Sequence, residues 1–126
     1  IEDATRDNQH YRRVLFTAKH SQLVLMNLKP GEEIGEEVHG MDQFIRFEEG
    51  EGTVVLDGEK HAVSDGFAVV IPAGTRHNVV NSGKTAALKL YSLYSPPEHK
   101  DGIIHKTKQE ADADHDHHFD GRTSLK

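Results

Sequence analysis

From residue 13 to residue 94, short segments of alternating or continuous apolar residues are separated by turn residues. Runs of this length and composition are typical of β-strands, and no apolar stripe with helical spacing persists through this part of the chain. The expected strands are 13–17, 23–28, 34–39, 43–48, 53–56, 60–63, 67–71, 77–81 and 86–94. So many short strands at regular spacing predict an all-β sandwich or barrel.

Two turn sequences predict how neighbouring strands are connected. The dipeptide Asp57-Gly58 suits a two-residue type I′ turn between the strands on either side of it. Residues 40–42 predict a second hairpin, which would pair 34–39 with 43–48. Pro72 and the residues after it break the chain before the strand that begins at 77.

The ends of the chain differ from its centre. We expect residues 1–12 to form an N-terminal arm, 13–95 a single barrel domain, and 96–126 a C-terminal extension. Within that extension, Thr107 and Glu110 have the spacing of a capping box, which predicts a short helix through about residue 113. The remainder, 114–126, is polar and is expected to be a mobile tail.

Composition narrows the choice of functions. The chain has 126 residues, a net charge of −6 and no cysteine, which excludes disulfides and thiol chemistry and agrees with a cytoplasmic location. No run approaches the roughly 20 apolar residues that cross a bilayer. Basic residues form no stripe, so nucleic acid and membrane surfaces are not expected partners.

Two segments combine turn residues with metal-binding side chains. They contain Gly31, Glu37, His39, Gln43 and Gly50 in the first, and Gly66, Pro72, Gly74, His77 and Asn81 in the second. Both resemble the paired motifs of the cupin family, and the spacing between them is similar to that of small bacterial single-domain cupins. Such proteins often carry the label mannose-6-phosphate isomerase-like. The resemblance implies a cupin β-barrel, which is a double-stranded β-helix or jelly roll, with a short C-terminal helix here.

The resemblance also implies a metal site whose ligands are Glu37, His39, Gln43 and His77. The commonest family pattern has His where Glu37 stands and Glu where Gln43 stands. The residues themselves agree with a shared site, because Glu37 and His39 are two apart and would lie on one face of a strand. Buried charges of this kind need a partner or a metal.

Two interpretations of this ligand set remain open. Glu37, His39 and His77 form a two-histidine, one-carboxylate set, as in many non-haem Fe(II) sites, with Gln43 as a weak fourth donor or a hydrogen-bonding neighbour. Alternatively, Glu37 points outward and only two strong ligands remain. The nitrogen and oxygen donors suit a divalent ion such as Fe, Mn, Ni or Zn.

The other histidines have simpler interpretations. His20 and His61 lie near turns and are expected to be solvated. His99 and His105 are expected on the surface, although they could cap the mouth of the barrel. The tail segment 115–118 has a metal-scavenging composition.

Alternation of side chains predicts which residues face the site. Arg46 follows Gln43 by three residues and is therefore expected on the opposite face of its strand. The pocket is expected to be mostly apolar, with inward neighbours Phe47, Ile45, Leu25 and Tyr91.

Three strong ligands would leave a coordination position open, which favours a metalloenzyme that acts on a small organic molecule by dioxygenase-type or isomerase-type chemistry. The alternative is a non-catalytic module that binds a metal or a small ligand, because one barrel of this kind serves many activities. A homodimer is expected, with Leu15, Phe16 and the strand 86–94 as candidate contact surfaces.

Overall fold

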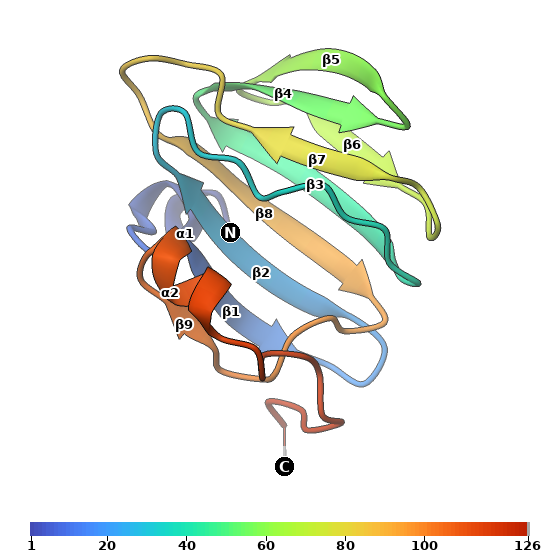
Figure 1. Ribbon diagram of the computed structural model, residues 1–126. Helices are drawn as coiled ribbons and strands as arrows, with labels where there is room; N and C mark the ends of the chain where they lie inside the picture. The colour runs from blue at the N-terminus through green and yellow to red at the C-terminus, as the bar shows by residue number, and fades with distance from the viewer. Residues whose placement is uncertain (126) are drawn as a thin grey trace.

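The computed structural model describes residues 1–125 and consists of two facing antiparallel sheets with two short helices (Figure 1). The strands are β1 (Arg12–Thr17), β2 (Gln22–Leu28), β3 (Asp42–Glu49), β4 (Glu51–Leu56), β5 (Glu59–Ser64), β6 (Ala68–Ile71), β7 (His77–Val80), β8 (Leu88–Ser95) and β9 (Ile104–His105). The helices are α1 (Glu2–Asp7) and α2 (Lys108–Ala113). The larger sheet has the order β6-β3-β8-β2-β1-β9 and the smaller one β5-β4-β7. The expected all-β jelly roll is therefore confirmed.

The core lies between the sheets because alternate residues of each strand point inward. In β3 these are Gln43, Ile45 and Phe47, which pair with Tyr94, Ser92 and Leu90 of β8. The fully buried apolar side chains include Val24, Met26, Leu28, Ile45, Phe47, Val54, Val79, Leu88 and Leu90. The polar members of this inner face gather at one end, where the candidate site lies.

The predicted hairpin between 34–39 and 43–48 is wrong. Residues 33–39 form no regular strand and lie instead beside β7, through the bridges Glu33–Val80 and Glu37–His77. The strand β3 pairs with β6 and β8. Backbone pairing with β7 therefore brings residues 33–39, which contain Glu37 and His39, directly to His77. The predicted hairpin to the strand that contains Gln43 does not form.

Glycine is required at two corners. Asp57 and Gly58 have φ values of 48° and 84°, which confirms the type I′ turn between β4 and β5. Gly50 has φ of 102°, and a Cβ there would lie 2.4 Å from the carbonyl oxygen of Ala87. A side chain at position 50 would thus disturb the turn from β3 to β4.

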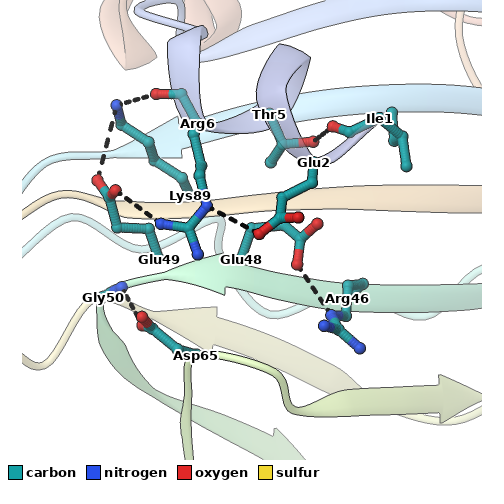
Figure 2. Close-up of polar contacts among 10 residues, drawn as sticks. All are labelled: Ile1, Glu2, Thr5, Arg6, Arg46, Glu48, Glu49, Gly50, Asp65 and Lys89. Carbon is teal, nitrogen blue, oxygen red and sulfur yellow. Dashed lines mark hydrogen bonds and ion pairs between the residues drawn. The ribbon is translucent and has the colours of Figure 1, made fainter.

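The N-terminal arm contains a helix that the sequence did not predict. Arg6 of α1 pairs with Glu2 at 3.3 Å and with Glu49 at 3.2 Å, and the Lys89 ammonium donates to the Arg6 carbonyl (Figure 2). These contacts attach α1 to the outer face of the large sheet, where β3 and β8 carry Glu49 and Lys89. A helix of six residues is too short to be stable by propensity alone, so it depends on this packing.

The C-terminal extension packs on the barrel. Thr107 caps α2 as expected, because its hydroxyl accepts from the Glu110 N–H at 3.1 Å. Beyond α2, the Lys100 N–H donates to the carbonyl oxygen of His117 at 2.8 Å, and the Phe119 N–H donates to that of Glu98 at 2.9 Å. These bonds place 117–119 beside 98–100, close to the end of β8. Residue 126, the last of the predicted mobile tail, lies outside the described residues.

Candidate metal centre

Glu37, His39 and His77 come together at one end of the barrel. The Glu37 N–H donates to the His77 carbonyl at 2.8 Å, and the His77 N–H donates back to the Glu37 carbonyl at 2.9 Å. One donor atom from each of the three side chains lies within 4.8 Å of the other two. The rings of His39 and His77 meet edge to face, with centroids 4.7 Å apart. Two imidazoles and one carboxylate thus converge on a single point.

His77 is oriented by its own turn. Its Nδ1–H donates to the carbonyl oxygen of Thr75 at 2.9 Å, which leaves Nε2 with a free lone pair. A metal-binding histidine commonly has its second ring nitrogen held in this way, which fixes both the tautomer and the ring orientation. The turn after Pro72 therefore positions His77 for coordination.

His39 is less buried than His77, yet one of its ring nitrogens is shielded from solvent. Its side chain is 12% exposed, and its Nε2 is buried without a hydrogen-bond partner, 3.6 Å from the Glu37 carboxylate. Burial lowers the pKa of His39, and the neighbouring His77 lowers it further, against an opposing effect of Glu37. The imidazole is thus held in the neutral form, which is the form that binds metal.

The Glu37 carboxylate faces His39 at 3.6 Å, although 42% of its side chain is exposed to solvent. The interpretation in which Glu37 points away from the histidines therefore does not describe this geometry. Its exposure keeps one side of the cluster open, as expected where a small molecule can approach a metal.

Within residues 1–125, Gln43 is linked to the three residues only through Tyr94, and its side chain is held by other groups. It is 3% exposed, and its Nε2 donates to the Ser92 hydroxyl at 3.0 Å and to the Tyr94 hydroxyl at 3.3 Å. Its Oε1 is buried without a partner. The Tyr94 ring in turn meets the His39 ring at a centroid distance of 6.0 Å. The free amide oxygen is thus available to a metal or to a ligand.

Taken together, these donors fit a divalent metal ion. The unpartnered Nε2 of His39 is the decisive observation, because a buried polar atom without a hydrogen bond is rare. Nitrogen and carboxylate donors suit a divalent ion such as Fe, Mn, Ni or Zn. Glu37, His39 and His77 would hold the ion, with Gln43 nearby.

The mouth of the site is polar, so the expected apolar pocket is wrong. A cavity of about 450 Å³ is lined by Glu37 and His39 together with groups from distant segments, and Val38 is its sole aliphatic lining residue within 1–125. The distant groups are Arg12, Tyr94, Glu98, His99, His117 and His118. The C-terminal extension therefore builds one wall of the cavity.

Leu25 and Tyr91 do not face this cavity, contrary to expectation. They pair with each other across β2 and β8, and Tyr91 also pairs with Arg46, which places all three on the outer face of the sheet. Phe47 and Ile45 do point inward. Arg46 points to the other face of β3 from Gln43, as predicted. The error arose because β2 and β8 have no motif that fixes which residues face inward.

His99 and His105 are buried, so the expectation of surface positions is wrong, and for His99 the barrel-mouth alternative is correct. Burial and the nearby Arg12 lower the pKa of His99 to about 2, so its imidazole is neutral. His20 and His61 are exposed, as predicted. His99 is buried because His117 of the C-terminal tail packs against it. The sequence alone does not predict where that tail lies.

Glu98 is a functional candidate that sequence reasoning missed. Its Oε2 is buried without a partner, and burial together with the charge of Glu37 raises the pKa of its carboxyl group. A carboxyl group with a raised pKa at a cavity wall is a candidate proton donor or acceptor. Its position directly after Pro97 offered no signal beyond its charge.

Within residues 1–125, no helix is both long and apolar enough to span a membrane.

Known proteins share both the sequence and the fold. Residues 24–94 match the sequence profile of the family described as Cupin domain. The uncharacterized protein YrkC of Bacillus subtilis is 47% identical over 123 residues, covering 92% of this chain and 66% of YrkC. The uncharacterized protein L612 of Acanthamoeba polyphaga mimivirus is 47% identical over 109 residues, covering 82% of this chain and 68% of L612.

The chain thus spans slightly less than two thirds of the length of YrkC. Among solved structures, that of BH2720 from Bacillus halodurans superposes with a TM-score of 0.87 at 46% identity, covering 90% of each chain. The fold therefore has a counterpart in a crystal structure.

Proposed function

Because the chain belongs to the cupin family, we propose that it is a metalloenzyme in which Glu37, His39 and His77 bind a divalent metal ion and the adjoining cavity receives a small organic molecule. The observation that carries this proposal is the convergence of three donor atoms within 4.8 Å, with the buried Nε2 of His39 unpartnered. Three protein ligands leave coordination positions open for a substrate.

When bound, the ion would supply Lewis acidity or activate dioxygen. The residues of the chain then have separate tasks. Burial lowers the pKa of His39 and so favours its neutral, metal-binding form, and the Thr75 carbonyl orients the His77 ring. The Tyr94 phenol, whose pKa burial raises, stays protonated and can donate a hydrogen bond. Glu98, with its raised pKa, is positioned to give or accept a proton at the cavity wall.

Either oxygenase-type or isomerase-type chemistry is compatible with this arrangement, since both need a metal with open positions and a nearby acid or base. A non-catalytic module would use the same site for binding alone. The two functions differ in one measurable property, which is whether a bound molecule is converted.

The test combines metal analysis with a substrate screen. The purified protein is analysed for Fe, Mn, Ni and Zn, then incubated with small organic acids and sugars in air and under argon, while oxygen uptake and products are followed. We expect turnover that scales with metal content and is lost in His77→Ala but kept in His61→Ala, which changes an exposed histidine. Binding without conversion by the metal-loaded protein would instead support the binding module.

We also propose that the protein is a homodimer. The outer face of the large sheet carries one continuous apolar row, because Phe16 pairs with Leu23, Leu23 with Leu93, Leu93 with Phe44, and Phe44 with Val70. Three of these side chains, those of Phe16, Leu93 and Val70, are exposed. An exposed apolar row can pack against the same row of a second copy across a twofold axis, which is an isologous contact. Leu15 and Phe16 were expected to take part; both are exposed, and Phe16 belongs to this row.

A further inference from the structure

Arg12 is a buried cation on the inner face of the large sheet. It pairs with Met26 of β2 and with His105 of β9, and 7% of its surface is exposed. The same cavity that Glu37 and His39 line is also lined by Arg12. A charged side chain on the inner wall of a barrel is costly unless something neutralises it.

Several N–H donors of the Arg12 guanidinium have no acceptor among residues 1–125. Its Nη1 donates to Nδ1 of His105 at 3.1 Å, and Nε2 of His105 then donates to Asp114 at 2.9 Å. No carboxylate of residues 1–125 forms an ion pair with Arg12 directly, and its Nε is buried without a partner. A guanidinium has five N–H donors in a planar fork, so Arg12 retains donors for a ligand.

A second unsatisfied group lies on the same wall. His99 is 3% exposed, its Nδ1 is 3.2 Å from Nδ1 of His117, and its Nε2 is buried without a partner. Burial and Arg12 lower the pKa of His99, which keeps the ring neutral and able to hydrogen bond without adding charge. Arg12 and His99 thus offer a cation and a neutral hydrogen-bonding group to the cavity.

From this geometry we propose that Arg12, with His99, binds the carboxylate of a small organic acid in the cavity, while the opposite end of the molecule reaches Glu37, His39 and His77. The metal end of this arrangement rests on the proposed function, whereas the carboxylate end rests on Arg12 alone. The fork of a guanidinium matches the two oxygens of a carboxylate. A cavity of about 450 Å³ has the size of sites for small molecules.

The acidic residues of the cavity are compatible with an anionic ligand. Glu37 would be neutralised by the metal ion that it helps to bind. Glu98 has a raised pKa, which reduces its tendency to carry a negative charge, and its Oε1 lies 3.6 Å from His118. Glu36 also lines the cavity, but it pairs with Arg76 at 3.4 Å.

Binding of succinate to the full chain, before and after chelator treatment, tests the proposal. Titration calorimetry compares the wild type with Arg12→Gln and with Arg13→Gln, which changes the exposed arginine next in sequence. We expect the Kd for succinate to rise about tenfold or more in Arg12→Gln, with or without metal, and to stay within about twofold in Arg13→Gln. The uncharged succinamide should bind weakly to all three proteins.

The metal content of Arg12→Gln should equal that of the wild type, which separates this test from that of the metal site. If Arg12→Gln does not fold, the Nε–H resonance of Arg12 in the wild type, assigned by its absence in Arg12→Lys, should shift during the succinate titration. Unchanged affinity in a folded Arg12→Gln, or an unmoved resonance, would overturn the proposal. Tighter Arg12-dependent binding of inorganic phosphate than of succinate would show that the site recognises phosphate, and the carboxylate assignment would be wrong.

Discussion

Gln43 places a neutral amide where a carboxylate would bind a cation more strongly. Its Nε2 is already engaged by Ser92 and Tyr94, and its Oε1 has no partner. An amide oxygen is a weaker ligand for a divalent cation than a charged carboxylate. The negative charge of the site therefore comes from Glu37, which stands 3.6 Å from His39.

Moving the carboxylate from position 37 to position 43 tests whether Glu37 coordinates the metal ion. In the double variant Glu37→His with Gln43→Glu, a carboxylate at 43 can accept from the Ser92 and Tyr94 hydroxyls, so the protein should fold normally. The donor set becomes three imidazoles and one carboxylate, and we expect divalent metal affinity to rise on the order of tenfold. Competition with a chromophoric chelator measures the affinity.

Gln43→Glu alone is the matched control, because it adds a carboxylate without moving Glu37. It should also bind metal more tightly than the wild type. Weaker binding by the double variant than by this control and by the wild type would mean that Glu37 has a task other than coordination.

The candidate ligands could be predicted from sequence because they lie at fixed spacings within two short segments. Glu37 and His39 are two residues apart, and His77 follows a turn that has its own signature. Arg12 and Glu98 could not be predicted in the same way. They reach the cavity through strand pairing and through the path of the C-terminal extension, and neither leaves a periodic signal in the sequence.

Among elements, the strands of the two sheets were predictable where turns or alternation define them. The turn at Asp57-Gly58 and the cap at Thr107 depend on local backbone chemistry, which the sequence encodes directly. Residues 33–39 were assigned to the wrong partner, because pairing with β7 is a contact over about forty residues that no local feature specifies.

The C-terminal extension shows the same limit more clearly. Its polar composition predicts mobility, yet backbone bonds place 117–119 beside 98–100 and Ser124 beside Thr17. Histidines that look like a loose metal-binding tail thereby become part of the cavity wall. Composition describes what a segment can do alone, whereas this segment is organised by the barrel surface beneath it.

At the scale of the whole molecule, the two faces of the large sheet have different tasks. The inner face carries the core and the candidate metal centre, and the outer face carries α1 at one end and the exposed apolar row. Burying that row against a second copy would remove apolar surface from water, at roughly 25 cal/mol for each Å².

Light scattering coupled to size-exclusion chromatography tests the proposed dimer. The wild type should elute at the mass of two chains, and Leu93→Asp, at the centre of the row, should shift the protein to one chain. Leu125→Asp changes an exposed apolar residue outside the row and should leave the dimer intact. A wild type that remains monomeric at high concentration would rule out this role for the outer face.

Metal content measured by elemental analysis shows whether His39 and His77 are primary ligands of a divalent ion. Wild type, His39→Ala, His77→Ala and the surface control His61→Ala are purified in parallel, and circular dichroism establishes that each is folded. We predict about one divalent ion per chain in the wild type and in His61→Ala, and loss of most of that metal in both other variants, since each removes one of three strong ligands. Retention of one ion per chain in both His39→Ala and His77→Ala would contradict the account.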